Sequence, residues 1–190
     1  MRGFINLGLL YSDAGQYDQA LSALEEAFQH AKLAGEEAEI GKIYLNMGLA
    51  LGQKGELAQA EAYLWQAEAI FQRFSNSQDL LLLGINLGIL YIEQKRWGEA
   101  REYLETALTT CRNLKNEYGE IEAIQGLVEY ELAKGNQQQA VEWLSELKRL
   151  VRPLDWKIRQ QRLQLLQKKY HRSLPGLQLD KLRWLAEVTD

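Results

Sequence analysis

The chain has few of the residues that carry covalent or metal chemistry. It holds one cysteine and two histidines among 190 residues, so no internal disulfide can form and a reducing compartment is expected. It has no HExxH or CxxC motif and no glycine-rich phosphate loop. We therefore expect no metal, no cofactor and no catalytic residue, and we interpret the lone Cys111 as a small buried hydrophobic side chain.

Proline and long apolar runs are also scarce. Only two prolines occur, whereas Ala, Leu, Glu and Gln, which favour helices, are abundant. No stretch reaches the roughly 18 consecutive apolar residues of a membrane span. The N-terminus lacks the order of basic, apolar and small residues that marks a signal peptide. These absences predict an all-α protein that is soluble and cytoplasmic.

In place of such motifs the chain has an internal repeat with a period of 40 residues. Asparagine, glycine, alanine and leucine each return at this spacing, in register, over three or four units. Such agreement between columns is very rare by chance. The columns are Asn6, Asn46 and Asn86; Gly8, Gly48 and Gly88; Ala20, Ala60, Ala100 and Ala140; and Leu24, Leu64, Leu104 and Leu144.

Each unit is predicted to form two helices joined by a turn. Apolar residues recur at helical spacing in both halves of a unit. A glycine that can adopt the left-handed conformation follows the first helix in every unit except the third, which has Lys95. The predicted helices span 1–14 and 18–34, 37–53 and 57–73, 78–94 and 97–114, and 117–134 and 137–151. The predicted units are 1–35, 36–75, 76–115 and 116–152, followed by basic capping helices over 153–190.

These columns resemble the consensus of the tetratricopeptide-repeat (TPR) family. The first unit carries it as Phe4, Leu7, Gly8, Tyr11, Ala20, Leu24 and Ala27, and the third as Leu87, Gly88, Tyr91, Trp97, Ala100, Leu104 and Ala107. The resemblance covers about residues 1–151. It implies a right-handed superhelical solenoid of antiparallel helix pairs that binds protein or peptide partners and is not an enzyme.

The chain departs from the family pattern in three places. Its period exceeds the usual 34 residues and is similar to the lengthened repeats of kinesin light chains and bacterial regulatory proteins. The fourth unit is degenerate, with Val128 in the glycine column and Glu131 in the tyrosine column. The first helix is shorter at its start than its counterparts. From this short first helix we expect that the chain is an excised piece of a longer protein, or that repeats precede it in the parent protein.

The resemblance places the first helix of each unit along a concave groove. Asparagine amides at one column offer both a donor and an acceptor to an extended peptide, and exposed apolar columns beside them are typical of an interaction surface. The asparagines could instead bond neighbouring helices and set the superhelical pitch. A second apolar column, at Ile5, Leu45 and Ile85, could line the groove or pack between helices. The predicted peptide-binding residues are Asn6, Asn46, Asn86, Leu9, Leu49, Ile89 and Lys42.

Charge is divided unevenly along the chain. Residues 1–147 carry 11 Lys/Arg and 22 Asp/Glu, whereas residues 148–190 carry 11 and 4. Apolar residues at helical spacing in the tail fit a cap on the last repeat. The basic face could instead contact an acidic partner, nucleic acid or an anionic membrane surface. The candidate contact residues in the tail are Arg159, Arg162, Lys168, Lys169 and Arg172.

The leading interpretation is a protein–protein interaction scaffold that holds a peptide or protein segment, as the adaptor or sensor part of a larger regulatory protein. Two alternatives stay open. One is a nucleic-acid-associated regulator that uses the basic tail, whose affinity would fall steeply with salt. The other is a self-association module that forms a homo-oligomer, which light scattering would detect.

Overall fold

The structure, a computed structural model, describes residues 1–151 of the chain. All regular secondary structure within these residues is α-helical. Each helix begins and ends within one residue of the range predicted from the periodicity. The predicted capping helices and the basic contact residues of the tail lie outside the described residues. The helices are α1 (Arg2–Asp13), α2 (Tyr17–Ala34), α3 (Glu37–Lys54), α4 (Leu57–Arg73), α5 (Ser77–Glu93), α6 (Trp97–Leu114), α7 (Glu117–Ala133) and α8 (Gln137–Val151).

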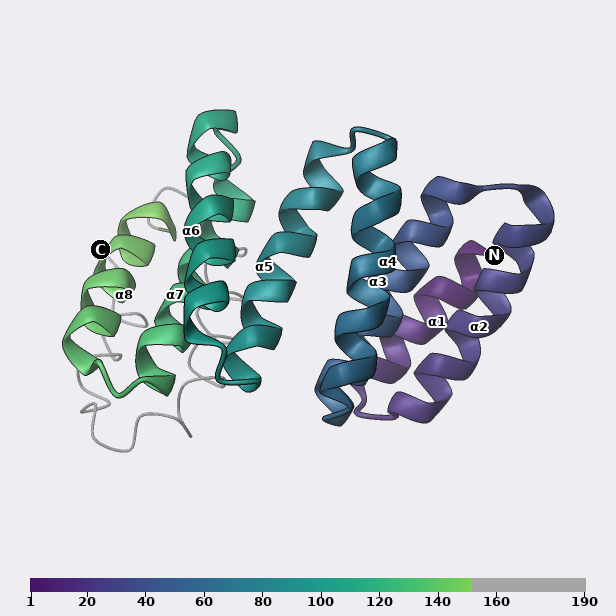
Figure 1. Cartoon of the computed structure of the whole chain (residues 1–190), viewed down its shortest axis with the longest axis horizontal. Coiled ribbons are helices and arrows are strands. Elements are labelled where there is room, and N and C mark those ends of the chain that lie inside the picture. The colour runs from purple at the N-terminus through teal and green to yellow at the C-terminus, as the bar shows by residue number, and fades with distance from the viewer. Residues whose placement is uncertain (152–190) are drawn as a thin grey trace, which may run out of the picture.

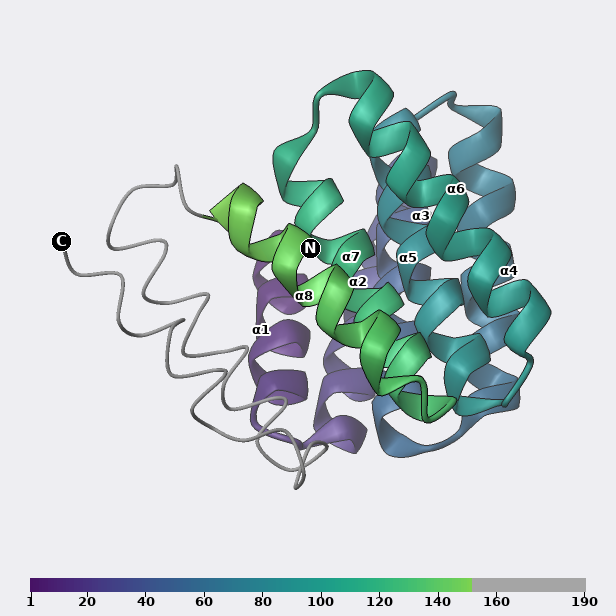
Figure 2. The same cartoon turned by 90° about the vertical axis from the view of Figure 1, so that its left-hand side faces the viewer.

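The helices form four antiparallel pairs that follow one another along the long axis of the molecule (Figure 1). In the view along that axis, successive pairs are turned relative to one another, so the array coils (Figure 2). We call α1, α3, α5 and α7 the leading helices and α2, α4, α6 and α8 the trailing helices. The fold is an all-α solenoid, in which each pair buries its apolar surface against its neighbours.

The glycine column brings the two helices of a pair close together. A Cβ atom added to Gly48 would lie 2.8 Å from Cγ of Leu64, and one added to Gly88 would lie 2.6 Å from Cγ of Leu104. Real Cβ atoms do not make such contacts, so only glycine permits this packing. The interpretation of this column as a close-approach position is confirmed.

The fourth unit also has a glycine at a close approach of two helices, but this glycine stands in the asparagine column. Gly126 is buried, and a Cβ atom there would lie 2.4 Å from Cδ2 of Leu104. Helix α7 therefore packs closely against α6 of the preceding unit. An asparagine at this position would not fit. The loss of the asparagine column in the fourth unit is thus a consequence of core packing.

The turns between helices have a left-handed residue. Gly55 and Gly135 adopt φ values of 91° and 81°, a conformation that costs glycine little. Lys95 and Lys115 adopt the same conformation, with φ values of 59° and 54°. The turn geometry is therefore kept even where the sequence supplies a residue that is strained in it.

Polar links join successive units along one edge of the solenoid. Nζ of Lys54 lies 2.7 Å from Asp18 of the preceding unit and 2.6 Å from Glu56. One unit further on, Arg96 contacts Glu99 and lies 2.7 Å from Glu61, which belongs to the preceding unit. Both cations bridge a trailing helix to the turn of the next pair. The pair of Lys54 with Asp18 is largely exposed and contributes little to stability, whereas the Glu61 side chain that pairs with Arg96 is only 12% exposed.

Candidate peptide-binding face

Each leading helix after the first buries two of its sides. In α3, Gly48 faces Leu64 of its own pair, while Ile43 and Met47 pack with Leu24 of the preceding pair. The remaining side points away from both trailing helices. We call this side of α1, α3, α5 and α7 the leading-helix face, and it carries all of the residues predicted to bind a peptide.

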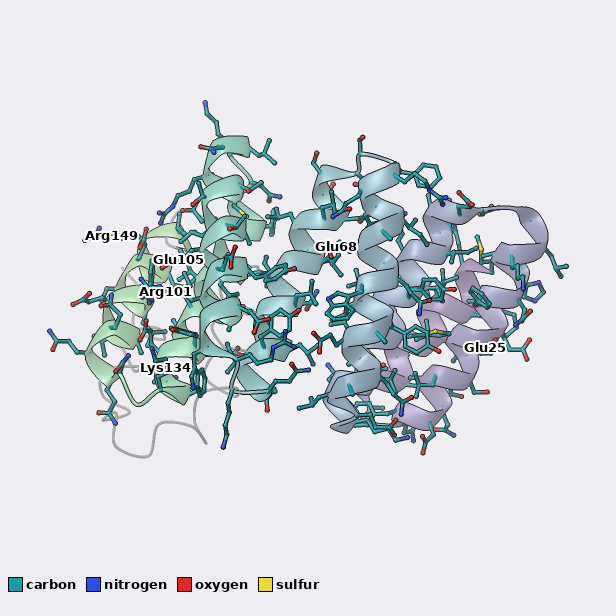
Figure 3. The ribbon with its side chains drawn as sticks, viewed as in Figure 1. Glu25, Glu68, Arg101, Glu105, Lys134 and Arg149 are labelled. Atoms are coloured by element: carbon teal, nitrogen blue, oxygen red, sulfur yellow. The ribbon has the colours of Figure 1, made fainter. Side chains whose placement is uncertain are left out.

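The apolar row on this face is partly open. Leu9 is 42% exposed, and Leu49 and Ile89 are half-buried. They occupy the same column in three successive units, so they form one row across α1, α3 and α5. The trailing helices present a different surface, with charged side chains such as Glu25, Glu68 and Glu105 (Figure 3).

The asparagines lie beside this row. Asn6 is exposed, and Asn46 and Asn86 are half-buried. Nδ2 of Asn86 donates a 2.8 Å hydrogen bond to the carbonyl oxygen of Leu82, one turn earlier in its own helix. Among residues 1–151, none of the three asparagines hydrogen-bonds a neighbouring helix. The bonds that pitch-setting asparagines would need are therefore not formed within this part of the chain.

The second apolar column belongs to the core. Leu45 and Ile85 are 4% and 3% exposed and join the main hydrophobic cluster. Between the two uses that the sequence left open for this column, the structure assigns these two residues to packing. Ile5, in the first unit, is half-buried.

The chemistry of the leading-helix face changes along the solenoid. Lys42 is in the second unit, where its Nζ lies 3.0 Å from Glu39 and its side chain is 43% exposed. In the fourth unit, Glu122 and Glu129 occupy the columns of Lys42 and Leu49. The face is therefore apolar and amide-rich over three units and acidic in the fourth. Glu122 and Glu129 already mark this change in the sequence.

The cysteine and the histidine among the described residues are packed against other side chains. Cys111 is fully buried, as we predicted for a small hydrophobic side chain. Desolvation raises the pKa of its thiol to about 11. The ring of His30 stacks on that of Phe4 at 5.5 Å between centroids. Within residues 1–151, no group of His, Cys, Asp and Glu side chains could hold a metal ion.

A polar hollow of about 770 Å³ lies between α6 and the ends of α7 and α8. Its charged groups have partners in the hollow. Arg101 pairs with Glu105 at 2.8 Å, with both side chains on α6 (Figure 3). Glu131, 8% exposed, accepts a 2.7 Å hydrogen bond from Asn136. Glu131 stands in the column of Tyr11 and Tyr91, and its bond to Asn136 explains how a carboxylate is tolerated there.

No helix among the described residues is both long and apolar enough to cross a bilayer.

Comparison with known proteins agrees with this architecture. The crystal structure of BtubC (BKLC) from P. vanneervenii is similar, with a TM-score of 0.65 and 25% sequence identity, over 77% of this chain and 61% of that chain. The chain thus spans less than two thirds of the length of BtubC. No curated protein sequence matches at a significant level. The family model of the tetratricopeptide repeat matches residues 2–73 and 79–151, and the chain therefore belongs to the tetratricopeptide-repeat family.

Proposed function

We propose that this chain is a protein–protein interaction scaffold whose leading-helix face binds an extended segment of a partner protein. The observation that carries the proposal is the partly open row of Leu9, Leu49 and Ile89 beside three asparagine amides. Apolar side chains would give affinity by burial. The amides would satisfy peptide groups that have no sheet or helix partner.

The order of the row indicates how a segment would lie on it. Leu9, Leu49 and Ile89 come from α1, α3 and α5 in turn. A ligand that crosses these helices would therefore place one apolar side chain on each of the three in succession. We propose that this binding serves as the adaptor or sensor part of a larger regulatory protein.

The test is a pull-down from a lysate of the source organism, read by mass spectrometry. The double variant Asn46→Ala, Asn86→Ala should lose partners that the unaltered chain retains. Asn113→Ala is the matched control, because Asn113 is an exposed asparagine on α6, away from this face. Circular dichroism must show that all three proteins are folded.

Retention of every partner by the double variant would contradict the proposed site. Partners that survive this substitution but are released by high salt would point to the basic tail.

A further inference from the structure

One side of α1 is apolar and uncovered by any part of residues 1–151. It consists of Gly3, Leu7, Leu10 and Ala14, and we call it the α1 outer side. Leu7 is 37% exposed and Leu10 is 66% exposed. Their equivalents in the later units are buried to 5% exposure or less, namely Met47 and Ala50, Leu87 and Leu90, and Leu127 and Tyr130.

The later units show what this side is built to contact. In α3 the equivalent residues Ile43 and Met47 pack against Leu24, Ala27 and Ala31 of the preceding trailing helix. The corresponding column positions in α5 and α7 lie in the main cluster in the same way. The α1 outer side therefore has the composition of a helix–helix interface for which residues 1–151 supply no second helix.

The pattern of this side is complementary to itself. Leu7 and Leu10 lie equally far from the midpoint of the four positions, and so do Gly3 and Ala14. If two α1 helices pack antiparallel about this midpoint, Leu7 of one copy meets Leu10 of the other, and Gly3 meets Ala14. Large residues then meet at the centre, and small residues at each end let the helices approach.

The charges of α1 agree with the same arrangement. Arg2 and Asp13 are its only charged side chains, both are exposed, and neither forms an ion pair within the described residues. They lie at opposite ends of the helix on the leading-helix face, Arg2 in the same column as Lys42. A two-fold axis keeps this face on the same side in both copies, so the long side chain of Arg2 in each copy can reach toward Asp13 of the other.

We propose that two copies of this chain associate through the α1 outer side, as an antiparallel α1–α1 pair about a two-fold axis. The leading-helix faces of both copies then open on the same side of the pair. A longer binding face would result, and this consequence alone rests on the proposed function. The dimer itself does not depend on it.

Sedimentation velocity of the full 190-residue chain, from about 1 µM to 1 mM, tests the association. We expect a monomer–dimer equilibrium in which Leu10→Glu weakens the dimer at least about tenfold, because it places two carboxylates in the interface. Leu33→Glu is the matched control, since Leu33 is 87% exposed on α2. It should leave the equilibrium unchanged. A chain that is monomeric throughout, or a dimer that Leu10→Glu does not weaken, would overturn the proposal.

Charge reversal tests the antiparallel geometry. Arg2→Asp alone would bring like charges together at both ends of the pair, and so would Asp13→Arg alone. Each variant should dimerise more weakly than the unaltered chain, and an equimolar mixture of the two should form a heterodimer. A mixture that associates no better than the separate variants would refute the antiparallel pairing. Sedimentation of the chain alone reports its self-association and the pull-down reports partner binding, so failure of either proposal would leave the other standing.

Discussion

Replacing Gly88 by alanine should destabilise the protein, although alanine is the better helix former. The added Cβ atom would lie 2.6 Å from Cγ of Leu104 and 2.8 Å from its Cδ2. Leu104 is fully buried, and Gly126 touches it as well, where a Cβ atom would lie only 2.4 Å from Cδ2. The leucine is held close by two helices and has no space into which it can withdraw.

The magnitude follows from two opposing effects. Overpacking a filled core costs about 1–3 kcal/mol, and the confinement of Leu104 places this site near the upper end of that range. Exchange of glycine for alanine inside a helix returns about 1 kcal/mol. We therefore expect Gly88→Ala to lower the free energy of unfolding by about 2 kcal/mol.

Gly84→Ala, one turn earlier in α5, is the matched control. Its nearest neighbour would be Cδ1 of Tyr103 at 3.9 Å, an ordinary contact. Only the gain in helix propensity should then act, so this variant should be more stable by roughly 0.5–1 kcal/mol. Two identical substitutions in one helix are thus expected to have opposite signs.

Guanidinium denaturation followed by circular dichroism measures both variants. Midpoint and slope should be compared together, because a repeat array can unfold in parts. Equal stabilisation by both substitutions would refute the close approach of α5 and α6. The double variant Gly88→Ala, Leu104→Ala gives a second check. Once the leucine is truncated, the added Cβ atom should cost little, and an unchanged cost would show that Leu104 is not its cause.

Three further predictions concern single groups. Lys95→Gly should raise the free energy of unfolding by about 1 kcal/mol, measured by denaturant titration, because Lys95 is left-handed at φ 59°. The pKa of Glu61 is lowered, since burial, which would raise it, is outweighed by hydrogen bonds from Gln94 and Arg96. Its contribution to stability is present above its unfolded pKa of about 4.3 and is lost as pH falls through the lower native value, so Glu61→Gln should flatten the acid limb of a stability–pH profile. Burial raises the pKa of the Cys111 thiol to about 11, so Ellman's reagent at pH 8 should label it only after unfolding, and immediate labelling of the folded protein would contradict its burial.

Much of this architecture could be predicted from local signals. Helix boundaries depend on turn residues and on apolar spacing within about ten residues, both of which are read along the chain. Because the units repeat in register, the same pair of helices could be predicted for each of them. The glycine column could be interpreted as a close approach because it returns at Gly8, Gly48 and Gly88 in the same register.

Whether the side chains of a column are buried was harder to predict. Leu45 and Leu49 are four residues apart, yet one is buried in the core and the other is half-open. The difference depends on where the neighbouring leading helices lie, and that is set by the angle between units. The predicted peptide-binding residues do share one side of their helices, because the period of the helix already placed them together.

The amino-acid sequence by itself determined the family, the helices, the order of the units and the positions that must stay small, because each depends on chemistry that recurs within one repeat. Tertiary structure alone decided how the units meet. It placed Gly126 against Leu104, paired Arg96 with Glu61 of the preceding unit, and left Leu10 exposed where its equivalents are buried. Each of these contacts joins residues from different units or depends on a neighbouring helix, so no single repeat contains the information.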